Sequence, residues 1–143
     1  TYRLNSANAA VGIEQLRMLP EWNERRRAAA KVYDQMLNGV GDLVLPPSPT
    51  KDVNPVYHLY TLRTKRRYEL KAHLEGKGVG VGLNYETPIH LQPIYKQLYG
   101  FKEGMLPITE KCCREVIAIP MFADITQDQI KYVVECVKEF YGK

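Results

Sequence analysis

The stretch VIAIPMFADITQDQIKYVVECVKEFY, residues 116–141, holds the signals of a short strand followed at once by a helix. VIAIP is apolar and β-branched and ends at a proline, which is typical of a short strand. Thr126 and Gln129 have the spacing of a capping box, and Ile125 and Ile130 can staple across it. The apolar residues that follow recur at helical spacing: Ile130, Val133, Val134, Val137 and Tyr141. A capped helix packed beside a small sheet is therefore predicted.

Two further helical patterns stand at the start of the chain. Residues 6–19 are rich in helix formers, and Asn5 or Ser6 can cap them. Apolar residues lie on several sides of this segment, which predicts a helix buried on more than one face. Pro20 breaks or kinks the pattern and can begin a second helix, residues 20–38.

The middle of the chain alternates between irregular and regular patterns. A proline-rich connector, residues 45–55, leads to VYHLYTLRT, which reads as a strand over residues 56–64. A short helix over residues 65–78 and a second strand, VGVGLNY at residues 79–85, come next. This order predicts an α+β fold, with long helices packed on one face of a small, mostly antiparallel sheet.

NYETPIHLQPIY, residues 84–95, follows neither a helical nor a strand period. It places His90 between two prolines and leads into a possible short helix over residues 93–99. Thr109 is then expected to cap another short helix before the final strand. Because no packing period explains His90, we expect it to have a binding role.

Composition sets the broad class. The chain has 143 residues, 45% of them hydrophobic and 25% charged, with a formal net charge of +4, as expected of one globular domain. It has neither a run of about 18 apolar residues nor a signal-peptide pattern. Of the three cysteines, Cys112 and Cys113 are adjacent. They suggest neither a disulfide framework nor a zinc site, and a reducing cytoplasm is favoured.

Three features suggest chemistry that their context does not support. GKGVGVG, residues 76–82, resembles a phosphate loop, yet it ends a helix and enters a strand, the reverse of a dinucleotide fingerprint. The basic clusters at residues 24–31 and 63–69 lie in no recognisable nucleic-acid module. Lys51 lies in the proline-rich connector, which lacks the desolvation that a Schiff-base lysine requires.

Seven motifs in register carry a family resemblance. In chain order they are YRLNSANAAVGIEQL, ERRRAAAKVYDQML, VYHLYTLRT, the R–x–x–L…L–x–GVG helix, NYETPIHLQPIY, LPITEKCCREVIAIPMF and TQDQIKYVVECVKEF. Together they resemble the C-terminal part of the DegT/DnrJ/EryC1/StrS family. The resemblance implies the C-terminal domain of a fold-type I, aspartate aminotransferase-like protein. Residues 1–143 would form this single domain, with connecting helices over residues 1–38 and an α+β small domain over residues 39–143.

The resemblance also implies a function for the parent protein. Such enzymes use pyridoxal 5'-phosphate (PLP) to pass an amino group, commonly from glutamate, to a nucleotide-linked keto-sugar in amino-sugar biosynthesis for polysaccharides or secondary metabolites. The Schiff-base lysine and the other principal cofactor contacts belong to the N-terminal domain, so no catalytic residue is expected in this chain. The expected partners are that N-terminal domain and a second subunit of a cytoplasmic homodimer, with no nucleic acid and no membrane.

The resemblance carries over to four residues of this chain. Tyr85 and His90 are expected to contact the nucleotide-sugar, for which tyrosine offers a stacking face and imidazole a hydrogen-bond donor. His58 is a further substrate candidate, although its predicted strand face, shared with Val56 and Tyr60, fits a core histidine equally well. Arg3 ends a stretch that, in related enzymes, approaches the cofactor phosphate of the partner subunit.

Two alternatives remain open. One is a regulatory or dehydratase-like relative that keeps the fold without transamination. The other is a stand-alone interaction module. A cofactor lysine upstream of Thr1 would favour the aminotransferase, and its replacement would favour the regulatory relative.

Overall fold

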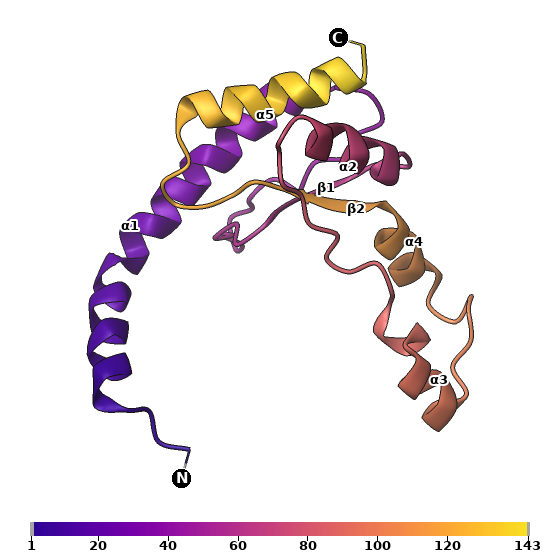
Figure 1. The fold of residues 1–143 in the computed structure, drawn as a ribbon, viewed down its shortest axis with the longest axis horizontal. Helices are drawn as coiled ribbons and strands as arrows, with labels where there is room; N and C mark the ends of the chain where they lie inside the picture. Colours follow the sequence, from indigo (N-terminus) through magenta and orange to yellow (C-terminus); the bar gives the residue numbers. More distant parts are fainter. Residues whose placement is uncertain (1, 143) are drawn as a thin grey trace.

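The computed structural model describes residues 2–142, and their architecture is the predicted α+β fold. The elements in chain order are α1 (Ser6–Leu37), β1 (Tyr60–Arg63), α2 (Arg67–Gly76), the 3-10 helix η1 (Ile89–Leu91), α3 (Pro93–Tyr99), α4 (Pro107–Glu115), β2 (Val116–Ile119) and α5 (Gln127–Phe140). Figure 1 shows α1, α2 and α5 gathered on one side of the sheet, while α3 and α4 extend away from it.

The sheet consists of β1 and β2, paired antiparallel from Tyr60 opposite Ile119 to Arg63 opposite Val116. One isolated bridge extends it on each side. Val44 pairs with Arg63 beyond β1, and Gly82 pairs with Ala118 beyond β2. The edges of the sheet are therefore formed by Val44, just before the proline-rich connector, and by the glycine-rich segment.

The core lies between the sheet and the three helices above it. Its fully enclosed side chains come from every one of these elements: Tyr33, Leu37, Tyr60, Leu62, Leu70, Leu74, Ile117, Ile130, Val134 and Val137. The hydroxyl of Tyr33 donates to the carbonyl of Pro120, and that of Tyr60 donates to the carboxylate of Asp34. Both buried tyrosines are thus satisfied, as a packed core requires.

The predictions for the C-terminal helix are confirmed. Thr126 accepts a hydrogen bond from the backbone N–H of Gln129, whose side chain accepts one from the N–H of Thr126, forming a complete capping box. The predicted apolar residues of α5 are buried, and Tyr141 packs at the edge of the same core. The short helix at residues 93–99 and the final strand are also confirmed.

Two helix boundaries differ from the prediction. Pro20 does not begin a new helix: it lies inside the 32-residue α1, which Asn5 caps by accepting from the N–H of Asn8. Helix formers on both sides continue the helix across the missing N–H, and Figure 1 shows its axis bending between its two halves. α4 begins at Pro107 rather than after Thr109, because proline is preorganised for the first helical position.

Two predicted strands are shorter or absent. The strand at residues 56–64 is reduced to β1, because Tyr57 has a φ of 50° and leaves the extended conformation. Residues 79–85 contribute only the bridge at Gly82. In that register the next pairing would involve Pro120, which has no N–H, and Val116, whose N–H is bonded to the carbonyl of Cys112.

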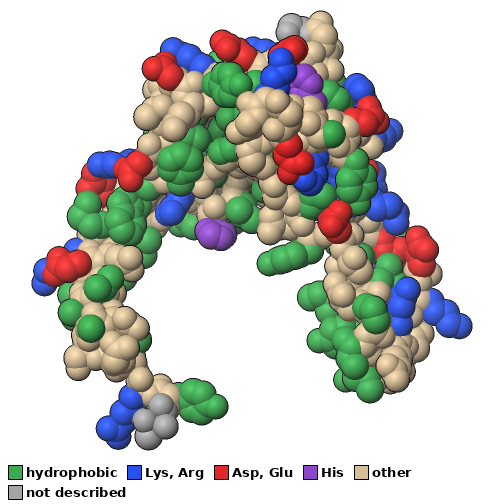
Figure 2. Space-filling model, viewed as in Figure 1, with side chains coloured by type: hydrophobic (Ala, Val, Ile, Leu, Met, Phe, Trp, Pro, Cys, Tyr) green, Lys and Arg blue, Asp and Glu red, His purple; other side chains and the backbone are tan. Residues whose placement is uncertain are grey.

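The N-terminal half of α1 and the region around α3 extend from the body as two limbs (Figure 1). The burial on several faces predicted for residues 6–19 is not found among the described residues, because the large apolar residues of this segment are exposed: Val11, Ile13, Leu16, Met18 and Leu19. Figure 2 shows hydrophobic side chains gathered on the side of the α3 limb that faces α1. Among residues 2–142, no helix combines the length and hydropathy that crossing a membrane requires.

Candidate functional site

The 84–90 loop (residues 84–90) leaves the sheet after the bridge at Gly82 and runs into η1. Its two large outward side chains are Tyr85, 74% exposed, and Ile89, 72% exposed. The loop therefore offers an aromatic ring with a free hydroxyl to whatever faces it. The predicted contact between Tyr85 and the nucleotide-sugar stays a prediction.

His90, at the other end of the loop, has a different environment from the one predicted. Its side chain is only 7% exposed, and its Nε2 lies 3.0 Å from Oε1 of Glu110, which is itself nearly buried. A histidine held in this way faces the protein interior. The predicted contact between His90 and a ligand is not tested by this geometry, but the imidazole already has a partner.

Glu110 collects several donors at the start of α4. Besides His90, its carboxylate accepts from the backbone N–H of Gly104, at 2.9 and 3.0 Å for the two oxygens, and from that of Leu106 at 3.2 Å. The hydrogen bond from Gly104, together with those from His90 and Leu106, holds the pKa of Glu110 below its usual value despite desolvation. The carboxylate is therefore ionised at neutral pH and acts only as an acceptor.

A second group of side chains holds the beginning of the 84–90 loop. Arg67, 4% exposed, donates from Nη2 to the hydroxyl of Tyr68 at 2.8 Å, and that hydroxyl donates to Oε1 of Glu86 at 2.9 Å. The other guanidinium nitrogen, Nη1, donates to the carbonyl of Cys113 near the end of α4. The buried cation thus lies at a helix C-terminus, where the helix dipole favours it.

His58 lies elsewhere, outside β1 and exposed rather than in the core. It lines an open cavity of about 540 Å³ whose walls come mainly from the proline-rich connector and include Tyr57 and Leu59. The core interpretation of His58 is therefore wrong, because the turn at Tyr57 redirects the chain before the strand begins. Its role as a substrate contact stays a prediction.

The remaining predicted positions are exposed. Arg3 precedes α1 in an exposed segment, and Lys51 is exposed in the connector. No lysine of residues 2–142 is buried, and within that range no group of His, Cys, Asp or Glu is arranged to hold a metal ion. Cys136 is a buried core residue.

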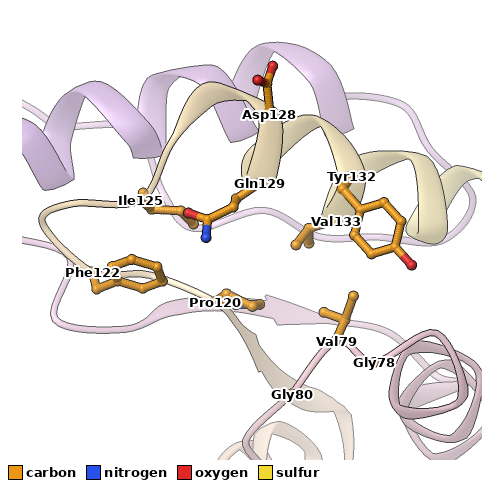
Figure 3. Close-up of a pocket in the computed structure, with 10 residues that line it drawn as sticks. All are labelled: Gly78, Val79, Gly80, Pro120, Phe122, Ile125, Asp128, Gln129, Tyr132 and Val133. Atoms are coloured by element: carbon orange, nitrogen blue, oxygen red, sulfur yellow. The ribbon is translucent and has the colours of Figure 1, made fainter.

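Figure 3 shows another cavity, of about 470 Å³, between α5 and the glycine-rich segment. Phe122 and Tyr132 stand at its ends, and a Cβ on Gly78 or Gly80 would meet open space there. The glycine-rich segment thus borders a cavity. None of the predicted site residues lines it.

Sequence reasoning missed the residues that hold the loop: Glu110, Arg67 and Tyr68. Glu110 had a partial signal, since an acidic residue in the first turn after a helix-starting proline is a typical helix N-terminus. No feature of the sequence indicated that Glu110 would pair with His90, twenty residues earlier. The interaction of Tyr68 with Glu86 likewise depends on how α2 and the loop are placed.

Comparison with known proteins gives one family and several close relatives. The family model described as the DegT/DnrJ/EryC1/StrS aminotransferase family matches residues 1–138. A pleiotropic regulatory protein of Geobacillus stearothermophilus is 40% identical over 140 residues, which cover 97% of this chain and 37% of that protein. A dTDP-3-amino-3,4,6-trideoxy-alpha-D-glucose transaminase of Streptomyces venezuelae is 37% identical over 138 residues, covering 96% of this chain and 36% of that protein.

Solved structures match over nearly the whole chain. The crystal structure of S. venezuelae DesV in complex with a ketimine intermediate has a TM-score of 0.93 and 36% identity, covering 99% of this chain and 38% of that chain. A DegT DnrJ EryC1 StrS aminotransferase from Brucella abortus has a TM-score of 0.89 and 28% identity, covering 99% of this chain and 37% of that one. The chain thus spans between a third and two fifths of the length of these relatives.

Proposed function

Because this chain belongs to the DegT/DnrJ/EryC1/StrS aminotransferase family, we propose that it is the C-terminal part of an enzyme that aminates a nucleotide-linked keto-sugar. The amino donor is glutamate, and the product enters amino-sugar biosynthesis for a polysaccharide or a secondary metabolite. The observation that carries this proposal is the DesV match, a TM-score of 0.93 at 36% identity to a structure that holds a ketimine intermediate.

The chain's own contribution to this reaction is to bind and orient the nucleotide-sugar. Tyr85 is the proposed direct contact, because its exposed ring can stack on a flat base or sugar face while its hydroxyl hydrogen-bonds. Pro88 follows in the same loop and restricts its backbone, which lowers the entropy that binding must overcome. His58, exposed beside the connector, is the second proposed contact.

The cofactor implied by the family is PLP, which supplies an electron sink for transamination when bound. Residues 2–142 do not fit a covalent PLP site. A Schiff-base lysine must be desolvated, and no lysine in this range is buried. We therefore assign the covalent site to the rest of the parent protein, and to this chain only Arg3 near the cofactor phosphate of the partner subunit.

The proposed assembly explains the exposed limbs. We propose that the N-terminal half of α1 is covered by the N-terminal domain of the parent or by the second subunit of a cytoplasmic homodimer. The support is that α1 leaves Val11, Ile13 and Leu16 more than half exposed, which is unusual for a helix of an independent domain. In this assignment, residues 1–38 connect the domains and residues 39–143 form the small domain.

The proposal is tested with the full-length protein, supplied with PLP, glutamate and a panel of dTDP-, UDP- and GDP-linked 3- and 4-keto-sugars. We expect 2-oxoglutarate beyond one equivalent per enzyme to form only when a keto-sugar is present, and this excess should equal the amino-sugar found by mass spectrometry. Absence of turnover with every member of the panel would contradict the proposal. A Tyr85→Ala variant is expected to raise KM for the keto-sugar.

A regulatory function is the second candidate, favoured by the 40% identity to the pleiotropic regulatory protein of G. stearothermophilus. Borohydride reduction of the full-length protein with PLP distinguishes the two. Stoichiometric attachment to one lysine supports the aminotransferase, whereas a protein that keeps the fold but gives no adduct supports the regulatory relative.

A further inference from the structure

We propose that His90 and Glu110 are positioning residues: their buried pair fixes the 84–90 loop so that Tyr85 faces the nucleotide-sugar, while neither side chain contacts it. This inference rests on the proposed function. It departs from the expectation that His90 itself binds substrate. Four observations carry it: the burial and hydrogen bonding of Glu110, its simultaneous bonds to residues 90, 104 and 106, the second anchor at Glu86, and the exposure of Tyr85 next to that anchor.

The carboxylate of Glu110 is enclosed by protein groups and is not accessible to a ligand. It accepts from two backbone N–H groups and from His90, all within 3.2 Å, and its side chain is 4% exposed. Because an ionised carboxylate only accepts, Nε2 of His90 must carry the hydrogen of this bond. Turning His90 toward a ligand would leave a buried charge with one fewer donor, which is costly.

Glu110 also holds together the two ends of a long segment of the chain. Its donors lie at residues 90, 104 and 106, so the arm (residues 91–106) begins and ends at the same carboxylate. The arm carries α3, which has no buried residue. We call the hydrogen bonds of Glu110 to His90, Gly104 and Leu106 the clasp. Because the arm has little packing of its own, its position depends on the clasp, and so does the position of the 84–90 loop that leads into it.

The loop has a second anchor at its beginning. Glu86 accepts from Tyr68, which in turn accepts from the buried Arg67. Only three residues lie between Glu86 and His90, and one of them, Ile89, projects outward. Tyr85 also projects outward, from the short stretch between the bridge at Gly82 and Glu86. A binding side chain held on a fixed loop loses less conformational freedom when the ligand arrives.

The test uses the full-length holoenzyme and separates the two halves of its reaction. His90→Leu removes the hydrogen bond to Glu110, and His90→Gln keeps an N–H donor near the position of Nε2. Glu110→Gln retains the side-chain shape, and it provides the test if the His90→Leu variant does not fold. Glu75→Gln is the matched control, because Glu75 is an exposed carboxylate paired only with Lys71 on the surface of α2.

The first measurement is hydrogen exchange by mass spectrometry. In His90→Leu and Glu110→Gln we expect peptides from residues 84–106 to exchange about tenfold faster or more, while peptides from α5 stay unchanged. His90→Gln should lie between His90→Leu and the wild type, and Glu75→Gln should match the wild type. If the exchange rates of residues 84–106 were unchanged in these variants, the proposed role of the clasp would be refuted, whatever the enzymatic activity of the variants.

The second measurement is kinetic. The donor half-reaction is followed as 2-oxoglutarate release from glutamate without keto-sugar, and it should be unchanged. KM for the keto-sugar should rise about tenfold if the loop holds its binding position a tenth of the time. Equal loss in both half-reactions, or faster exchange with an unchanged KM, would overturn the positioning role.

The outcome also separates this inference from the proposed function. A wild-type protein that transaminates no keto-sugar refutes the proposed function and with it the positioning of Tyr85, whereas the clasp is still decided by the exchange data. A wild-type enzyme that is active, with His90 variants that lose keto-sugar affinity without faster exchange, would instead assign His90 a direct ligand contact and refute this inference alone.

Discussion

Replacing Tyr141 by phenylalanine removes one hydroxyl at the point where the end of α5 is fastened to the sheet. That hydroxyl donates to Oδ1 of Asp42 at 2.7 Å and lies 2.8 Å from Oγ1 of Thr64. The ring itself packs against Gly41 and lies 5.9 Å from the guanidinium of Arg66, and phenylalanine keeps both contacts. The substitution therefore isolates the hydrogen bond.

The expected cost follows from what each partner retains. Asp42 still accepts from Thr64 and from the backbone N–H of Lys65, so its carboxylate remains satisfied. A hydrogen bond to a charged group contributes about 1.5–3 kcal/mol when enclosed, and Asp42 is exposed, which lowers the contribution. We expect Tyr141→Phe to reduce the free energy of unfolding by ~1–2 kcal/mol.

Urea unfolding of the 143-residue chain, followed by circular dichroism, measures this loss. With an m-value of about 2 kcal/mol/M, the midpoint should fall by roughly 0.5–1 M. The control is Tyr99→Phe, which deletes the same atom from a 63% exposed ring that makes no hydrogen bond through its hydroxyl. A midpoint within error of the wild type, or an equal loss in the Tyr99 variant, would refute the reasoning.

Four further outcomes are expected. Leu74→Ala, at a fully buried position of α2, should cost about 2–5 kcal/mol in the same urea experiment, whereas Leu74→Met should cost less than about 1.5. Thr126→Ala should cost about 1 kcal/mol by removing the cap of α5, and Thr126→Ser should restore it. Partial burial of Asp42 raises its pKa, but the hydrogen bonds from Thr64, Tyr141 and Lys65 outweigh this and leave the pKa lowered. Its stabilisation is therefore complete above the unfolded pKa of about 3.9 and lost as pH falls through the folded pKa, so the cost of Asp42→Asn should shrink below about pH 4. Burial raises the pKa of Tyr141 to about 12, so wild-type stability should fall as pH rises from about 10 toward 12. This fall should be smaller in Tyr141→Phe, in which the buried Tyr33 and Tyr60, whose pKa values are also raised, still contribute.

Local signals were sufficient for several elements. The capping box of α5 involves neighbours three residues apart, so Thr126 and Gln129 could be paired from their spacing alone. The same holds for α3, where Pro93 begins the helix and Gly100 ends it in the left-handed conformation. Each of these features is decided by interactions within one turn of the chain.

Strand lengths and the surroundings of the histidines could not be predicted in this way. Residues 79–85 alternate as a strand should, but the ladder they would join is limited by Pro120 and by the bonded N–H of Val116 in another segment. The sequence pattern placed His58 in a strand, but the left-handed backbone conformation of Tyr57 interrupts that strand.

The sequence by itself determined the α+β class, the capped C-terminal helix and the irregular course of the chain around Pro88, because these depend on residues close together in the chain. Only the tertiary structure decided that His90 faces inward. Its partner Glu110 lies twenty residues away, and a buried imidazole and carboxylate find each other only once α4 and the arm are in place.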